Sequence, residues 1–558
     1  MKDKKQVLGI FIILFIAFIL RILYINTEFW YDEACSWFTA KQDFPFGIIG
    51  NLLHLDMQHT PVYFFILHFW MEIFGDSEIA IRSLSLIFGI LSVPLTFIVS
   101  KKLFDKTFAA ISTAIVGVCP LLAFFSVEAR MYPLTVFLVL LSLNFLVDFE
   151  QKGDKKSLIK LILSNILIPY TLVGGIFYNI SLAICYGVYL YKQKQDSFWL
   201  YLKGFCIEAV FLIPYIILIG YYAKMRSLFV IRHEGEFAFW QMIEVIRNFF
   251  SSTIVDNPYW PTLNSYEMTP ALILLVIIPC GYFLYGLFKG FVKSSGFLKS
   301  LYCLFFLNFI LALIFAILEV NIFTMRYILY LLAPLFILSV NGLSISLTKR
   351  HLTIFLAYFA LTSICFNFQY SKKIKNLKHM ALSAVREESQ VLGLTNKDII
   401  IEPFASDAPY YFRFLDSVRM HNFDFHKELR NPYNSKYYDI EQQKLMDKDA
   451  KYGVIYDSVF AEHCFSNNFV DYFLNDVNNK TESGRFVLIA LYGEDGNNIV
   501  PIEDLRNSVK NITDVKKNKV QIMLQKYLYD ILFLLERDFT FIQKYKKGIF
   551  TYILYQKR

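Results

Sequence analysis

Two adjacent carboxylates, Asp32 and Glu33, follow the first strongly apolar segment of the chain, in the sequence W-Y-D-E-A. Three aromatic residues flank the pair: Trp30, Tyr31 and Trp37. Aromatic rings of this kind settle where a membrane meets water. A carboxylate pair fixed at that boundary is suited to proton transfer with a substrate that is part lipid and part sugar. Adjacent acids are also common in solvated loops, and that interpretation stays open at this point.

Arginines recur at the ends of later apolar segments, as Arg82, Arg130 and Arg326. A guanidinium there can bind lipid headgroups or extend its charge toward water. Three of them on the same side as a carboxylate pair instead favour a pocket that grips a phosphate through charge-assisted hydrogen bonds. Glu128 precedes Arg130 by two residues and can pair with it or orient it, and Tyr132 adds a hydroxyl donor.

A histidine, His59, stands in the sequence Q-H-T-P, just before an apolar stretch. Pro61 is suited to the first position of a helix, which would place His59 in the loop near the helix N-terminus. A lone histidine is often structural, so both a structural and a substrate-binding role are kept for it.

The composition of the 558-residue chain indicates a polytopic membrane protein. It is 56% hydrophobic and 18% charged, with 57 Phe, whereas soluble domains are about 45–50% apolar and about 25% charged. The net charge of +8 is therefore no sign of nucleic-acid binding. In such a protein, Lys and Arg mainly report which loops stay in the cytoplasm.

A membrane span needs about 20 apolar residues, and eleven segments are candidates. They are 7–25, 79–100, 107–125, 133–149, 157–171, 175–190, 200–222, 269–288, 300–318, 327–347 and 351–368. The shorter apolar stretch 62–75 contains His68 and Glu72, and we expect it to be a helix lying at the interface. Apolar residues at helical spacing predict a second interfacial helix at 239–250.

The distribution of Lys and Arg predicts the orientation of these spans. If 62–75 does not cross, the predicted inner segments are much richer in Lys and Arg than the outer ones. This puts the N-terminus in the cytoplasm and the loops 26–78, 126–132, 223–268 and 319–326 outside. Four lysines after the last span run against the trend: Lys372, Lys373, Lys375 and Lys378.

The composition changes after Phe368, which divides the chain into a transmembrane domain (1–368) and a soluble extracytoplasmic α/β domain (369–558). The apolar runs 398–402, 452–456 and 486–491 predict buried strands. Segments 377–392 and 520–535 predict helices. The closing sequences F-T-F-I and I-F-T-Y-I-L-Y predict a hairpin.

The ordered motifs resemble the GT-C glycosyltransferases, in particular the branch with the protein O-mannosyltransferases and the aminoarabinose transferase of lipid A. The resemblance reaches to about residue 350. It rests on W-Y-D-E, on H-T-P-V-Y-F-F-I-L-H-F-W-M-E-I-F-G-D-S-E-I-A-I-R-S-L-S, on P-L-L-A-F-F-S-V-E-A-R-M-Y and on F-T-M-R-Y. The chain has H-T-P where many relatives have H-P-P.

The resemblance implies a polyprenyl-phosphate-linked sugar as donor, an acceptor hydroxyl, and inversion at the anomeric carbon. Asp32, at the position that matches the family's catalytic acid, would take the acceptor's proton. Glu33 would tune Asp32 or hold the acceptor. The substrate-binding residues would be His59, Arg82, Glu128, Arg130, Tyr132, Arg326 and Tyr31.

No metal-binding cluster is evident, although some relatives use a divalent cation. The isolated D-K-D sequence at 447–449 lies in a Lys-rich turn. Two other functions stay open. A lipid or sugar transporter or flippase would need polar or broken helices near the bilayer midplane, for which Glu208 and His68 are candidates. A non-catalytic envelope protein would not need Asp32. The sequence names neither the sugar nor the acceptor.

Overall fold

The computed structural model describes residues 2–27, 29, 31–54, 59–228, 239–254, 270–317, 324–377, 383–395, 398–402, 419–422, 477–479, 481–492, 535–547 and 550–558. They form two compact units. The first comprises Met1–Thr27, Thr39–Gly220 and Glu234–Asn376, and the second comprises Glu28–Phe38, Tyr221–His233 and Leu377–Arg558.

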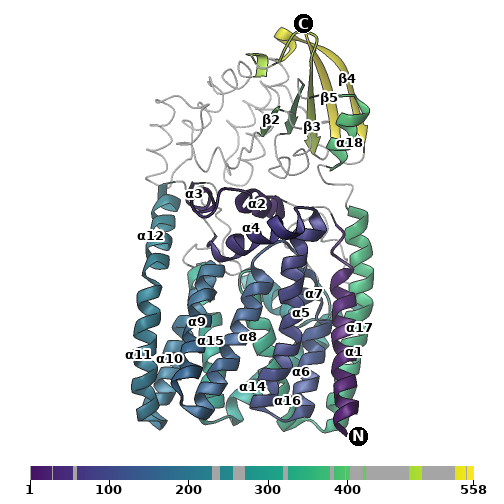
Figure 1. Cartoon of the computed structure of the whole chain (residues 1–558). Helices are drawn as coiled ribbons and strands as arrows, with labels where there is room; N and C mark the ends of the chain where they lie inside the picture. The colour runs from purple at the N-terminus through teal and green to yellow at the C-terminus, as the bar shows by residue number, and fades with distance from the viewer. Residues whose placement is uncertain are drawn as a thin grey trace. The chain divides into compact units, whose positions relative to one another are not determined.

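Helices make up nearly all of the described part of the first unit, where most of them stand side by side (Figure 1). In chain order the helices are α1 (Lys2–Ile22), α2 (Tyr31–Ala40), α3 (Phe46–His54), α4 (Val62–Phe74), α5 (Glu78–Leu103), α6 (Lys106–Val118), α7 (Pro120–Phe125), α8 (Tyr132–Lys152), α9 (Lys155–Thr171), α10 (Ile176–Gln193), α11 (Gln195–Phe211), α12 (Ile213–Leu228), α13 (Phe239–Phe250), α14 (Pro270–Lys293), α15 (Gly296–Ile317), α16 (Leu332–Ser346), α17 (Lys349–Leu377) and α18 (Ser383–Val391). Short 3₁₀ turns precede α10, at Val173–Gly175, and α16, at Leu329–Leu331.

The chain is a multi-pass membrane protein. Seven helices within the described residues are long and apolar enough to cross a bilayer, or up to eight if the bent pair α11–α12 counts as one span. The predicted number of eleven is not confirmed. Segments 7–25 and 107–125 give the shorter apolar helices Leu8–Ile22 and Lys106–Val118, and α6 ends at Val118, just before Cys119 and Pro120. Segment 157–171 forms α9, which has 17 residues. α11 and α12 are bent by 46°.

Two short helices occupy the segments for which interfacial helices are predicted. α4 has 13 residues and lies across the end of α5 in Figure 1. α13 covers the predicted segment 239–250. His68 of α4 hydrogen bonds through Nδ1 to the carbonyl oxygen of Ala40 (2.7 Å), which ties α4 to the end of α2.

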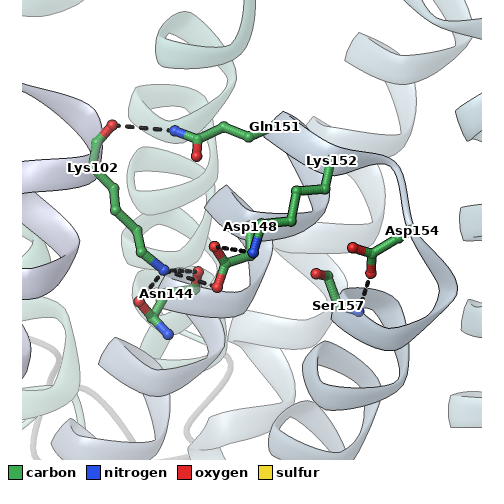
Figure 2. A network of polar contacts seen from close by, with 7 residues as sticks. All are labelled: Lys102, Asn144, Asp148, Gln151, Lys152, Asp154 and Ser157. Atoms are coloured by element: carbon green, nitrogen blue, oxygen red, sulfur yellow. Dashed lines mark hydrogen bonds and ion pairs between the residues drawn. The ribbon is translucent and has the colours of Figure 1, made fainter.

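Polar contacts join the helices at the end of the bundle where the sequence predicts cytoplasmic loops (Figure 2). Lys102 of α5 donates to Asn144 (2.7 Å) and Asp148 (2.8 Å) of α8, and Lys152 lies 3.3 Å from Asp148. Asp154 caps α9 by accepting from the main-chain N–H of Ser157 (2.6 Å). Hydrogen bonds from the main chain and the side chain of Ser157 lower the pKa of the Asp154 carboxyl.

The second unit contains a five-stranded mixed sheet in the order β2-β1-β3-β5-β4. Its strands are β1 (Ile399–Glu402), β2 (Arg419–Asn422), β3 (Phe486–Tyr492), β4 (Phe539–Lys547) and β5 (Phe550–Lys557). β1 pairs in parallel with β2 and β3, while β5 pairs antiparallel with β3 and β4. The predicted strands at 398–402 and 486–491 and the closing hairpin are confirmed.

α18 lies within the predicted helix 377–392 and is fixed to β4. The Glu388 carboxylate accepts hydrogen bonds from Tyr545 (2.6 Å) and Lys547. Burial acts to raise the pKa of Glu388, but these two bonds outweigh it and the pKa lies below its usual value. The predicted strand 452–456, the predicted helix 520–535 and the D-K-D sequence lie outside the described residues.

A buried polar cluster joins four helices within the membrane-spanning region. Glu208 of α11 is 4% exposed and accepts hydrogen bonds from Asn165 of α9 (3.0 Å) and Asn179 of α10 (2.8 Å). Asn165 in turn accepts from Ser142 of α8 (2.6 Å). Such groups are costly in lipid unless the protein satisfies them, so the cluster holds α8 to α11 together.

Replacing Glu208 by Ala should lower the free energy of unfolding in detergent by about 2 kcal/mol, and with it the melting temperature, because the side-chain amides of Asn165 and Asn179 lose their acceptor. Glu208→Gln, which keeps one carbonyl oxygen, should lose less. Ile207→Ala on the same helix is the control, since Ile207 is 53% exposed. Equal melting of Glu208→Ala and the wild-type protein would show that the cluster does not hold the helices.

Candidate functional site

The segment between α7 and α8, residues 126–132, is buried throughout, although it contains two charged side chains. Pro120 starts α7 and Pro133 stands in the first turn of α8, so two short helical breaks frame the segment. Arg130 is 1% exposed and Glu128 is 5% exposed. Buried charges persist only where other groups compensate them, so this segment is a candidate for ligand binding.

His59 and Arg130, which the sequence places 71 residues apart, are hydrogen-bonded through His59 Nε2 and Arg130 Nη2. An arginine has only donors, so His59 Nε2 must accept. This bond therefore requires the tautomer of His59 whose Nε2 carries no proton. The ring of Phe64 meets the His59 ring edge-to-face at 6.2 Å and helps to fix it.

The main chain of Arg130 is held from α5. Ser85 Oγ donates to the carbonyl oxygen of Arg130 (3.0 Å), and the hydroxyl groups of Ser85 and Tyr63 lie 3.0 Å apart. Tyr63 and Ser85 are fully buried. Both ends of Arg130, the guanidinium and the backbone, are thus fixed by residues from α4 and α5 and the loop before α4.

Arg82 lies one turn before Ser85 on α5 and binds the main chain beyond α1. Its Nη1 donates to the carbonyl oxygens of Ile25 (3.1 Å) and Thr27. This contact fixes the chain just before the acidic stretch of residues 28–33. The side chain is 2% exposed.

Arg326 reaches the same region through aromatic rings. Its guanidinium carbon lies 5.0 Å from the centroid of the Tyr327 ring, and the Tyr327 ring meets Tyr132 edge-to-face at 6.3 Å. Tyr132 also meets Phe125 of α7 at 5.6 Å. The structure therefore links His59, Arg130, Tyr132 and Arg326 to the 126–132 segment, and Arg82 to it through the helix that carries Ser85.

The predicted catalytic pair lies in the first turn of α2. Asp32 is half-buried and Glu33 is 1% exposed, and Ser36 Oγ donates to the main-chain oxygen of Asp32 (3.1 Å). A helix N-terminus favours negative charge. Tyr31 is the first residue of α2. These residues belong to the second unit, whereas the other predicted site residues belong to the first.

One buried arginine was not predicted from the sequence. Arg21, near the end of α1, is 1% exposed and donates to Ser126 Oγ (3.1 Å) and to the carbonyl oxygens of Gly117 (2.8 Å) and Val116 (3.4 Å). The available signal was an arginine inside an apolar segment, which marks either the end of a span or a polar contact within the bundle. Among the described residues, no group of three or more His, Cys, Asp or Glu could hold a metal ion.

Comparison with known proteins identifies the fold. Residues 58–218 match the family model of the dolichyl-phosphate-mannose-protein mannosyltransferases, a stretch that contains His59, Arg82, Glu128, Arg130 and Tyr132. The crystal structure of ArnT from Cupriavidus metallidurans in the apo state aligns with a TM-score of 0.54 at 10% identity, over 99% of this chain and 98% of ArnT. The chain has the GT-C glycosyltransferase fold. The predicted resemblance to this superfamily is confirmed.

Other structures with this GT-C fold are also similar. ArnT from Cupriavidus metallidurans bound to undecaprenyl phosphate aligns with a TM-score of 0.53 at 12% identity, covering 99% of this chain and 98% of that one. The Archaeoglobus fulgidus oligosaccharyltransferase tethered to an acceptor peptide aligns with a TM-score of 0.50 at 13% identity, over 99% of this chain and 74% of that one. No curated protein sequence matches the chain. The family model and the fold together support glycosyltransferase activity.

Proposed function

We propose that this protein transfers a sugar from a polyprenyl-phosphate carrier to an acceptor hydroxyl at the outer face of a membrane, with inversion at the anomeric carbon. The observation that carries the proposal is Arg130, a buried guanidinium fixed at both ends inside the segment that the family model matches. Arginine is suited to bidentate binding of phosphate. In ArnT of Cupriavidus metallidurans, the same fold binds undecaprenyl phosphate.

The proposed reaction is a single displacement. The Asp32 carboxylate accepts the proton of the acceptor hydroxyl while its oxygen attacks the anomeric carbon. The bond between that carbon and the phosphate oxygen breaks, and its electron pair leaves with the polyprenyl phosphate. Attack opposite the leaving group inverts the anomeric carbon. A phosphate monoester is a weak base, so it needs no general acid.

The arginines act on the charge that develops on the leaving phosphate. Arg130 contacts the phosphate in this proposal, with Arg326 and Tyr132 beside it, and Glu128 orients Arg130. Arg82 contributes by holding the main chain before the acidic stretch, through its bonds to Ile25 and Thr27. Convergence of Asp32 and Glu33 with Arg130 is part of the proposal.

The membrane arrangement is proposed with it. The N-terminus lies in the cytoplasm of a bacterial cell, and residues 369–558 form an extracytoplasmic domain. The Lys-rich network of Figure 2 then lies at the cytoplasmic end of the bundle, as the distribution of basic residues predicts. A divalent cation could assist the phosphate, but no step requires one.

The experiment is an assay of the purified protein with a panel of polyprenyl-phosphate sugars and cell-envelope extracts as acceptors. We expect free polyprenyl phosphate to appear together with a glycosylated acceptor. A flippase would instead move the intact donor across reconstituted vesicles without cleaving its sugar–phosphate bond. Translocation with no released polyprenyl phosphate would therefore replace the transferase with a transporter.

A further inference from the structure

The break between α6 and α7 leaves main-chain carbonyl groups at the end of α6. The carbonyl oxygen of Val116 would bond to the N–H of residue 120, but Pro120 has none. Cys119 adopts φ −55° and ψ 121°, which ends the helix. The carbonyl groups of Gly117 and Val118 therefore lack the N–H groups that a continued helix would supply. These residues are buried, so their carbonyl groups need partners from elsewhere in the protein.

Two side chains from other helices supply these partners. Arg21 of α1 donates to the carbonyl oxygens of Val116 and Gly117, at 3.4 Å and 2.8 Å. Asn367 of α17 donates to the carbonyl oxygen of Val118 (3.2 Å). α1 and α17 lie side by side in Figure 1, and Asn367 also accepts from Tyr24, in the turn just after α1 (2.9 Å).

Arg21 differs from Asn367 because it also holds the candidate phosphate-binding segment. Its Nε donates to Ser126 Oγ (3.1 Å), and Ser126 is the first residue of 126–132. Gly89 of α5 closes the other side, since a Cβ atom there would lie 2.3 Å from Ser126 Oγ. Ser126 is therefore confined between Arg21 and the backbone of α5.

We propose that Arg21 is a positioning residue, which uses the fork of its guanidinium to lock the 126–132 segment, and with it Arg130, onto the broken end of α6. This rests on the proposed function of Arg130. A lysine cannot replace it, because a single ammonium group cannot bond in the plane to Ser126 and to two carbonyl groups at once. Among the described residues, Arg21 has no carboxylate partner, which fits a role in directed hydrogen bonding.

Three variants separate positioning from stability. Ser126→Ala removes the bond from Arg21 Nε to Ser126 and leaves the bonds from Arg21 to the carbonyl groups of α6. Arg21→Lys disturbs both. Asn367→Ala removes a bond to the same end of α6 without touching Ser126, and it is the matched control. For each variant, the melting temperature, the KM for the lipid-linked donor, kcat, and hydrogen exchange of residues 126–132 are measured.

We expect Ser126→Ala and Arg21→Lys to raise the donor KM about tenfold or more and to speed hydrogen exchange in 126–132. Asn367→Ala should lower the melting temperature and leave KM and exchange in that segment as in the wild type. Wild-type exchange and KM in Ser126→Ala, or equal effects of Arg21→Lys and Asn367→Ala, would overturn the proposal.

The two proposals fail differently. If the wild-type protein transferred no sugar, the proposed function would fail, but hydrogen exchange would still test the positioning. If transfer occurs and exchange in 126–132 is unchanged in Ser126→Ala, the positioning role is wrong while the transferase stands. Should Arg21→Lys fail to fold, Ser126→Ala carries the test alone.

Discussion

Asp32→Asn is expected to lower kcat for sugar transfer by about a hundredfold or more, while the protein folds and binds its donor as before. An amide has nearly the shape of the carboxylate but cannot accept the acceptor's proton, and general-base catalysis contributes about 10²–10⁴-fold. The measurement is the initial rate of polyprenyl phosphate release by purified protein at saturating donor.

The control for this variant is Asp43→Asn, in the same predicted outer stretch. Asp43 is exposed and lies between α2 and α3, so its replacement should leave kcat unchanged. A rate for Asp32→Asn within threefold of the wild type would remove Asp32 from the mechanism (about 0.7 kcal/mol in activation free energy). Glu33 would then be the next carboxylate to test.

Arg130→Ala is expected to reduce kcat/KM for the lipid-linked sugar by about 10²–10³-fold. The variant lacks the guanidinium that would donate hydrogen bonds to the negatively charged leaving phosphate. Arg130→Lys should recover part of this, since it keeps a charge but loses the planar fork. The kinetics are measured with donor lipid varied at fixed acceptor, and the melting temperature is measured in parallel.

Arg350→Ala is the matched control, because Arg350 is exposed in the first turn of α17 and makes no predicted contact with donor. His59→Gln should weaken donor binding less than Arg130→Ala, since the Gln oxygen can still accept from the guanidinium. If Arg130→Ala bound and turned over the donor as the wild type does, the phosphate would be held elsewhere.

Periodicity and segment length predicted much of this fold. Long apolar runs such as those of α5 and α8 became helices because a chain in lipid must satisfy its own backbone. Short apolar runs predicted β1 and β3, and the closing aromatic sequences predicted the β4–β5 hairpin. These signals are local, and local signals can be read from a single sequence.

What the sequence did not predict depends on contacts between distant residues. The predicted span at 107–125 is divided into α6 and α7 at Pro120, because hydropathy does not register a break whose carbonyl groups are bonded by other helices. Arg21 lies inside the predicted span 7–25, and its role depends on its bonds to Gly117 and Ser126, which are distant in the sequence. The bond between His59 and Arg130 joins the loop before α4 to the segment before α8, and no pattern in either segment encodes it.

The structure gives contacts for some of the predicted site residues, and the roles of others stay predictions. His59, Arg130 and Tyr132 were chosen from motifs, and the structure adds the bonds and ring contacts that fix them. Arg82 was expected to bind phosphate, and it donates to main-chain carbonyl oxygens. The catalytic roles of Asp32 and Glu33 stay predictions.

Lipid mass spectrometry of a strain that lacks this protein is the decisive measurement. When a transferase that consumes a lipid-linked sugar is deleted, that lipid-linked sugar is no longer consumed. We predict that a glycosylated polyprenyl phosphate accumulates in the deletion strain, and that wild-type protein, but not Asp32→Asn or Arg130→Ala, returns it to the normal level. An unchanged lipid profile, or full restoration by Asp32→Asn, would contradict the transferase.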